Sequence, residues 1–284
     1  MKSLNNPLVS VLMTVYNREK YIEQAIKSVL ASTYTNFELI IVDDRSTDNS
    51  LKIAQQFEKE DQRIKVFQNE QNLGDYPNRN QAASYATGKY LKYVDADDMI
   101  YPYGLEQLVY YMEKFPDAGY GLCSLDQDKH SIYPIQLSSK EAYQWNYFKS
   151  SIFHKAPLSS IIKKDAFSDV GGFSKVRHYG DFEFWHKISL KYPVVLMPHG
   201  MVWYRTSEGQ EASIRKKNTM NQVKTLNVSR HYVAKFNFYK NSKQQEVLNY
   251  KHLKSYQRYL MQQFKRFNFK DIFMSYKVFH AKEF

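Results

Sequence analysis

The chain has 284 residues, of which 43% are hydrophobic and 24% charged, and this composition excludes wholesale disorder and collagen-like repeats. The single cysteine, Cys123, excludes an intramolecular disulfide, and no apolar run reaches the ~18–20 residues that a membrane-spanning helix needs. The first apolar run, residues 8–15, is short and lacks a small-residue cleavage site, so it is not expected to be a signal peptide. We therefore expect the protein to be cytoplasmic.

The positive charge is concentrated in the last quarter of the chain. The net charge is +11, yet residues 1–213 carry 24 Lys and Arg against 26 Asp and Glu, whereas residues 214–284 carry 16 against three. Such a change of composition is typical of a boundary between parts with different roles. We therefore predict two units, 1–213 and 214–284.

Apolar runs alternate with helical patterns through the first half of the chain. Four buried strands are predicted from the runs at residues 8–15, 37–42, 64–67 and 90–94. Helices are predicted between them from apolar residues at helical spacing in 22–30, 51–57, 82–83 and 105–112. Asn17 is predicted to cap the first helix, and Ser46, Thr47 or Asp48 the second. Four strand–helix units predict an α/β fold whose parallel sheet has helices on both faces.

The second half of the chain is less regular. Residues 125–155 indicate loop and short helix, and short strands are predicted at 194–197 and 202–204. The basic unit is predicted to be helical, because apolar residues recur there every three or four positions: Val247, Tyr250, Leu253, Tyr256, Leu260, Phe264 and Phe267. A further helix is expected from Phe269 through Phe273 and Tyr276.

Polar side chains follow three of the predicted strands where each strand ends: Tyr16-Asn17, Asp43-Asp44 and Asp95-Ala96-Asp97-Asp98. Alone, each cluster has a plainer interpretation, as an acidic turn, a helix cap or a packing tyrosine. The carboxyl ends of parallel strands, however, meet at one edge of a sheet, where ligands collect. There, carboxylates suit Mg²⁺ or Mn²⁺, and a carboxylate can accept a hydrogen bond from a nucleobase or ribose. We therefore predict one site at this edge.

With further motifs, these clusters resemble the inverting glycosyltransferases of family 2, which have the GT-A fold. The resemblance spans residues 7–205 and rests on Val9-Ser10-Val11, Val42-Asp43-Asp44, Asn72-Leu73-Gly74, Arg79-Asn80, Gly88-Lys89-Tyr90, Asp95-Ala96-Asp97-Asp98, Gly171-Gly172-Phe173 and Gly180-Asp181 with Trp185. Each motif is weak alone, but their order and spacing are specific. The resemblance implies a Rossmann-like, mostly parallel central sheet in a catalytic domain, 1–213. Its nucleotide-sugar half is about 1–124, its acceptor half about 125–213, and 214–284 form a C-terminal helical extension.

The resemblance also implies roles for individual residues. Tyr16 would stack on the nucleobase, with Asn17 shaping the same loop; Asp44 would bind the base, with Asp43 on the ribose side and Arg79 near the donor. Asp95 and Asp97 match the DxD motif that holds Mn²⁺ or Mg²⁺ on the diphosphate, and Asp98 would assist at the sugar or metal. Asp181 matches the general base. Gly180 stands where the family often has Glu, and Thr206-Ser207 where many members have a histidine ligand.

The function that these roles imply is metal-dependent inverting transfer of a hexosyl or N-acetylhexosaminyl group, from a UDP-sugar or other nucleotide sugar to a glycan or lipid-linked glycan of a surface polysaccharide. One base and one metal are enough for this chemistry. The enzyme alternative is a sugar nucleotidyltransferase, which would need a Gly-rich basic loop where Thr14 to Arg18 stand. The non-enzymatic alternative is a basic nucleic-acid-binding module. The sequence leaves the donor sugar, the linkage and the oligomeric state open.

The basic unit, 214–284, has 14 Phe and Tyr and admits three interpretations. It is a helical extension packed on the catalytic domain, a surface that attaches to the anionic inner face of the cell membrane, or a nucleic-acid-binding or self-association surface. The first two are preferred, and no nucleic acid is expected as a partner. The membrane interpretation adds a peripheral location to the cytoplasmic one.

Overall fold

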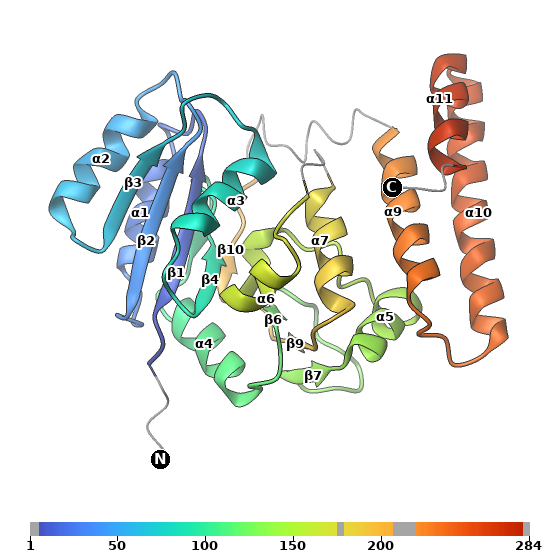
Figure 1. Cartoon of the computed structure of the whole chain (residues 1–284), viewed down its shortest axis with the longest axis horizontal. Coiled ribbons are helices and arrows are strands. Elements are labelled where there is room, and N and C mark those ends of the chain that lie inside the picture. Colours follow the sequence, from blue (N-terminus) through green and yellow to red (C-terminus); the bar gives the residue numbers. More distant parts are fainter. Residues whose placement is uncertain (1–5, 175–178, 207–219, 281–284) are drawn as a thin grey trace.

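The computed structural model describes residues 6–174, 179–206 and 220–280. A central sheet crosses the left and middle of the molecule, and three long helices form its right end (Figure 1). The strands lie in the order β3 (Ile64–Gln68), β2 (Phe37–Asp43), β1 (Val9–Val15), β4 (Tyr90–Tyr93), β8 (Ser160–Lys163), β6 (Tyr120–Leu122), β9 (Val194–Leu196) and β7 (Ile135–Leu137). The pairs within β3-β2-β1-β4 and the β6–β9 pair are parallel, and β8 and β7 pair antiparallel to their neighbours.

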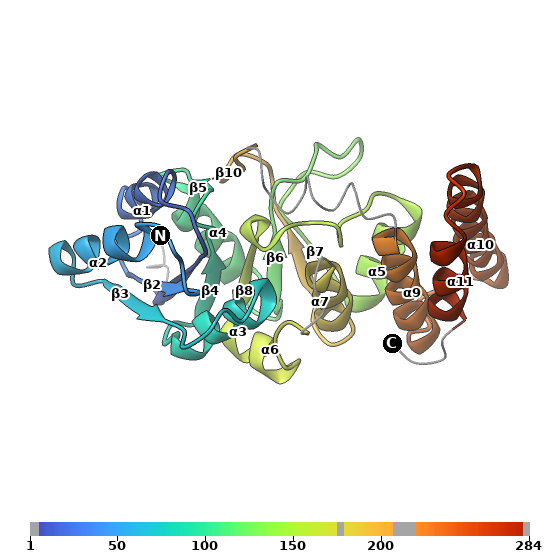
Figure 2. The same ribbon diagram turned by 90° about the horizontal axis from the view of Figure 1, so that it is seen from above.

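Helices cover both faces of this sheet (Figure 2). One face carries α3 (Asp75–Tyr85), α6 (Lys164–Asp169) and α7 (Gly180–Ser189), and the other carries α1 (Ile22–Leu30), α2 (Ser50–Glu60) and α4 (Gly104–Lys114). Side chains of β1 and β2 alternate between two cores, with Leu12 and Ile40 in the first and Met13 and Ile41 in the second. Strands buried on both faces read as continuous apolar runs, which is why they could be predicted. The predicted α/β class is confirmed.

The cap prediction for Asn17 is wrong. The first helix begins only at Ile22, and Asn17 adopts a left-handed conformation with φ 54°. Its side-chain oxygen instead accepts a hydrogen bond from the Thr47 N–H at 2.8 Å, and its own N–H donates to Ser46 Oγ at 3.0 Å. Asn17 thus joins the loops that follow β1 and β2. Asn49 precedes α2, and Asp48 supports that helix by accepting from the Ser50 N–H at 2.9 Å.

The segment 125–155 contains more regular structure than predicted. It holds β7 and α5 (Ser139–Phe148), which begins with a capping box between Ser138 and Glu141. A second, two-stranded sheet pairs β5 (Met99–Ile100) with β10 (Val202–Trp203). The short 3₁₀ helix η1 (Pro157–Ser159) leads into β8. Elements this short depend on their partners rather than on local pattern.

Three helices follow in the basic unit: α9 (Met220–Lys235), α10 (Ser242–Lys265) and α11 (Phe269–Phe279). The predicted boundary between 213 and 214 lies outside the described residues. Val228 of α9 and Leu248 of α10 belong to the same hydrophobic core as Trp185 of α7. The basic unit is therefore packed on the α/β part of the chain. No helix in the described ranges is both long enough and apolar enough to cross a membrane.

The predicted apolar stripe of α10 is mostly wrong. Only Tyr256 of that stripe is buried and Leu260 half-buried, whereas the others are exposed: Val247, Tyr250, Leu253, Phe264 and Phe267. The buried face consists instead of Leu248, His252, Tyr256, Tyr259 and Gln263. Polar His252 faces inward because Ser229 of α9 hydrogen-bonds its Nε2 at 3.0 Å. That partner is distant in sequence, so the inward face was not evident.

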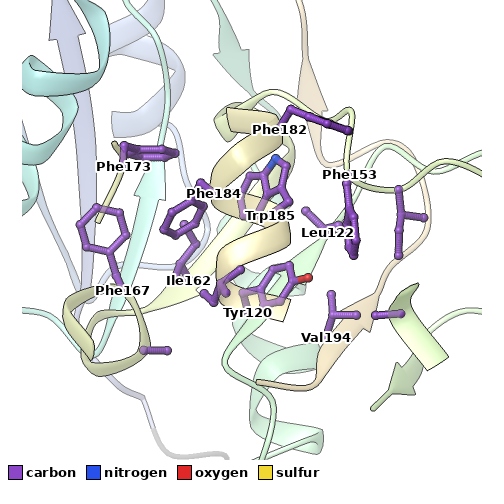
Figure 3. Packing of buried hydrophobic residues seen from close by; sticks show 14 of the residues in the cluster. Tyr120, Leu122, Phe153, Ile162, Phe167, Phe173, Phe182, Phe184, Trp185 and Val194 are labelled. Atoms are coloured by element: carbon purple, nitrogen blue, oxygen red, sulfur yellow. The ribbon is translucent and has the colours of Figure 1, made fainter. Parts of the chain in front are cut away.

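An aromatic cluster supports the start of α7 (Figure 3). The Trp185 ring stacks on Tyr120 of β6, with centroids 5.5 Å apart, and Phe184 packs against Phe173 at 4.5 Å. The Trp185 Nε1–H donates to the Lys155 carbonyl at 2.6 Å. Buried aromatics with a satisfied polar group hold one orientation, so α7 is a rigid platform for its first residues.

Candidate active site

A cleft of about 580 Å³ opens at the carboxyl ends of β1, β2 and β4. Seven of the predicted site residues line it: Tyr16, Asp44, Arg79, Asp95, Asp97, Asp98 and Asp181. Asn17 and Asp43 are not among its lining residues. Asp43 is fully buried behind the cleft, where its Oδ2 accepts from the Ser46 N–H at 3.0 Å and from Gln68 Nε2 at 3.1 Å. Asp43 and Asn17 therefore brace the loops that carry the site.

Asp44 organises the loop that precedes α3. Its Oδ1 accepts from the Leu73 N–H and from Asn69 Nδ2, both at 2.8 Å, and its Oδ2 accepts from the Gly74 N–H at 2.8 Å. Gly74 has φ 85°, a conformation that glycine adopts without strain. A carboxylate has about four acceptor positions, so the three internal bonds leave one for a ligand.

Arg79 neutralises two carboxylates beneath the cleft. Its guanidinium forms two bonds to Asp95, at 2.7 and 3.0 Å, and one to Asp75 at 2.8 Å. Burial raises the pKa of the Asp75 carboxyl, and the charge of Asp95 acts in the same direction, while Arg79 opposes both. Arg79 thus offsets the repulsion between the Asp75 and Asp95 carboxylates. Asp75 was missed as a site residue, although its i,i+4 spacing to Arg79 on a helix is a recognisable signal.

The other two acidic side chains of the motif have different partners. Arg18 Nε donates to Asp97 Oδ2 at 3.0 Å, and the Arg205 N–H donates to Asp98 Oδ1 at 2.9 Å. Burial, with the charge of Asp95 as the next cause, raises the pKa of Asp98 to about 8. Arg18 was also missed, because nothing in its immediate sequence ties it to a carboxylate 79 residues later.

Asp181 lies at the first turn of α7 and is 9% exposed. Its Oδ1 accepts from the Phe182 N–H at 2.8 Å, which fixes the side chain at the helix N-terminus. The position before Asp181 has no room for a side chain, since a Cβ at Gly180 would lie 2.8 Å from the ring of Tyr76. Glu183, two residues later, accepts from Tyr232 Oη of α9 and from Ser174 Oγ at 3.0 Å, and so ties α7 to α9.

The carboxylates fit a divalent cation that also has ligands from a substrate. Among the described residues, no group of three or more His, Cys, Asp or Glu side chains could hold a metal ion alone. Mg²⁺ and Mn²⁺ are commonly held by one or two carboxylates plus substrate phosphates, which needs no such group. Arg79 binds both carboxylate oxygens of Asp95, whereas Arg18 binds Asp97 through Oδ2 alone, so Asp97 at the cleft wall is the better-suited ligand. Thr206 follows Arg205, at the place where many family members would have a histidine ligand to the metal, and Ser207 lies outside the described residues.

Comparisons with known proteins identify the family of this chain. The family described as Glycosyl transferase family 2 matches residues 10–171. Glycosyltransferase GlyG of Streptococcus pneumoniae is 30% identical over 71% of this chain and 72% of its own. A putative teichuronic acid biosynthesis glycosyltransferase, TuaG of Bacillus subtilis, is 44% identical over 48% of this chain and 57% of its own.

Two solved structures share the fold. Residues 1–349 of Staphylococcus aureus TarS, in complex with UDP-GlcNAc, superpose with a TM-score of 0.66 at 20% identity, covering 84% of this chain and 70% of that one. The mannosyltransferase PcManGT of Pyrobaculum calidifontis, in complex with GDP-Man and Mn²⁺, superposes with a TM-score of 0.64 at 16% identity. The match covers 90% of this chain and 75% of that one.

The chain therefore belongs to glycosyl transferase family 2. It is a glycosyltransferase with the mostly parallel sheet and C-terminal helices expected from its sequence. The predicted family and enzyme class are confirmed.

Proposed function

We propose that this glycosyltransferase moves a sugar, with inversion, from a nucleotide sugar to the hydroxyl of a growing surface glycan. The observation that carries the proposal is the convergence of Asp44, Asp97 and Asp181, far apart in sequence, on one cleft of about 580 Å³. A UDP-sugar is the first choice of donor. The similar TarS structure is a complex with UDP-GlcNAc, that of PcManGT is a complex with GDP-Man and Mn²⁺, and TuaG is named for teichuronic acid biosynthesis.

In this mechanism Asp181 is the general base. The acceptor hydroxyl gives its proton to the Asp181 carboxylate as its oxygen bonds to the anomeric carbon, while the bond from that carbon to the diphosphate oxygen breaks on the opposite face. Tyr16, which is 48% exposed at the cleft, stacks on the base, and Asp44 accepts from it. Asp97 would hold Mn²⁺ or Mg²⁺, which when bound would supply positive charge beside the leaving diphosphate.

A panel of nucleotides and nucleotide sugars tests this proposal. We expect UDP or one other nucleoside diphosphate to raise the thermal unfolding temperature with Mn²⁺, and EDTA to remove that effect. At a ligand concentration of about 100 Kd, binding stabilises the folded state by about 2.7 kcal/mol, which is readily measured. Asp97→Asn should abolish the Mn²⁺-dependent part, because the neutral amide lacks the negative charge with which the carboxylate attracts the cation.

The alternatives predict different results in the same assays. A sugar nucleotidyltransferase would release pyrophosphate from a nucleoside triphosphate and a sugar 1-phosphate. A nucleic-acid-binding module would show no nucleotide-sugar preference, and its salt-dependent binding of RNA or DNA would survive Asp97→Asn. Either result would contradict the proposal.

We further propose that the far side of α10 and α11 attaches to an anionic membrane surface. Large apolar side chains are exposed along these helices and in the turn between them: Tyr250, Met261, Phe264, Phe267, Phe269, Phe273 and Tyr276. Residues 242–279, which span these two helices, carry eight Lys and Arg against two acidic residues. Basic residues near an anionic surface contribute about 1 kcal/mol each, and aromatic side chains suit the interface.

Vesicle sedimentation tests the membrane proposal. Replacing both Lys265 and Lys270 with glutamine should weaken binding to phosphatidylserine-containing vesicles by about 30-fold, since two charges are lost. The matched control replaces exposed Lys52 and Lys59 with glutamine. These residues lie in α2, at the opposite end of the molecule in Figure 1, so binding should be unchanged. Equal binding of the wild type to neutral vesicles would rule out the electrostatic contribution.

A further inference from the structure

A second cleft, of about 620 Å³, adjoins the first. Its walls come from α5 and α7 on one side and from α9 and α10 on the other, so the basic unit forms half of it. Asp181 lines both clefts, and among the described residues it is the one that they share. A base at this junction faces the nucleotide cleft on one side and a separate space on the other.

The described lining of the second cleft has an uncharged, sugar-compatible chemistry. Apart from Asp181 it contains no Asp, Glu, Lys or Arg, and its polar groups are amides, hydroxyls and imidazoles. Burial lowers the pKa of His252 to about 4, so this imidazole is neutral at physiological pH. Aromatic rings complete the walls: Tyr147, Tyr179, Phe182, Tyr256 and Tyr259. Aromatic faces beside a few amides and hydroxyls suit a sugar ring, with its apolar face and equatorial hydroxyls.

A chain of hydrogen bonds holds the two walls together. His186 Nδ1 lies 2.7 Å from the Phe182 carbonyl, which can only accept, so Nδ1 carries the proton. Burial lowers the pKa of His186 to about 3, so its Nε2 is a bare acceptor for Tyr147 Oη at 2.7 Å. Tyr147 in turn accepts from Ser229 Oγ at 2.7 Å, and Ser229 accepts from His252 Nε2–H at 3.0 Å.

Each member of this chain belongs to a different helix. His186 lies in α7, Tyr147 in α5, Ser229 in α9 and His252 in α10. Every donor meets one acceptor, so a shift of α9 or α10 would leave buried polar groups unsatisfied. The outer wall of the second cleft is therefore fixed relative to Asp181.

We infer that the second cleft binds the acceptor, an uncharged saccharide, with α9 and α10 as its outer wall and the reacting hydroxyl directed to Asp181. This inference rests on the proposed function and goes beyond it, because it assigns the acceptor class and gives helices of the basic unit a share of the site. The sequence had placed the acceptor half within 125–213 alone. The reaction is the same transfer: the acceptor O–H proton passes to Asp181, and the sugar bond moves from the diphosphate to the acceptor oxygen.

Bulky substitutions on the outer wall test this inference. Gln222 of α9 and Ser255 of α10 line the cleft and are exposed, so tryptophan at either position narrows the cleft without disturbing the core. Gln257, exposed on α10 and outside the cleft lining, provides the matched control Gln257→Trp. The probes are neutral p-nitrophenyl glycosides of glucose, galactose and N-acetylglucosamine, together with the acidic p-nitrophenyl glucuronide.

Two rates are compared in each variant with the best nucleotide sugar: release of nucleotide to water, and transfer to the glycoside confirmed by product mass. We expect neutral glycosides to accelerate nucleotide release in the wild type. Gln222→Trp and Ser255→Trp should each lower kcat/KM for the glycoside at least about tenfold, or 1.4 kcal/mol, and leave release to water unchanged. Gln257→Trp should match the wild type in both rates.

Each other outcome is decisive. Unchanged transfer in both tryptophan variants, acceptance of the glucuronide alone, or rapid donor hydrolysis that no neutral glycoside accelerates would overturn the acceptor assignment. If the wild type neither binds nor hydrolyses any nucleotide sugar, the proposed function itself fails, which is a separate result. Loss of release to water together with transfer would place these residues in folding rather than in acceptor binding.

Discussion

Replacing Asp181 with asparagine should lower the rate of sugar transfer by about 10²–10⁴-fold, the usual effect of losing a general base. The amide has nearly the same shape, and its oxygen can still accept from the Phe182 N–H, so α7 should begin unchanged. It cannot take up the proton of the acceptor hydroxyl. Transfer is measured by product formation at saturating acceptor, and nucleotide binding by thermal stabilisation with Mn²⁺, which should stay at the wild-type level.

A matched control for this variant lies on a neighbouring helix. Asp165 occupies the first turn of α6, as Asp181 does in α7, but it is exposed and lies outside both clefts. Asp165→Asn should leave transfer and nucleotide binding unchanged. Transfer at the wild-type rate in Asp181→Asn would show that another group removes the proton.

Replacing Arg79 with methionine should lower the free energy of unfolding by about 3–5 kcal/mol, the cost of leaving buried charges without their partner. Arg79 is 7% exposed and neutralises both Asp75 and Asp95. Without it, nothing opposes burial and the charge of Asp95, so the pKa of the Asp75 carboxyl in the folded state rises further, and the folded state binds a proton that the unfolded state does not. The loss of stability should therefore be larger at pH 8 than at pH 5.

Chemical denaturation at the two pH values measures this effect. The control is Lys191→Met, because the Lys191–Asp169 pair is about half exposed, with side chains 55% and 45% accessible. A surface pair of this kind contributes little to stability, so the control should change little at either pH. If Arg79→Met were as stable as the control, the buried cluster would not depend on the guanidinium.

The sequence predicted those parts of the fold that rest on local pattern. The strands β1, β2 and β4 were predictable because each is buried on both faces and mostly apolar, and the polar residues that follow them marked the cleft. The positions of Asn17 and Asp43 were not, since Asn17 binds the loop after β2 and Asp43 binds Gln68 at the end of β3. The inward face of α10 was missed for a similar reason, as His252 becomes a core residue only through Ser229. Patterns along a chain do not reveal partners across it.

The hydrogen-bonded relay from His186 to His252 has a consequence for engineering. A hybrid enzyme can be made by exchanging the C-terminal helices of one glycosyltransferase for those of another, with the aim of changing the acceptor. In this protein such an exchange must include Tyr147 and His186 along with Ser229 and His252. Otherwise the chain of hydrogen bonds between these residues would have to form between parts of two different proteins. The natural crossover point for a working hybrid is therefore upstream of α5, not at the start of the basic unit.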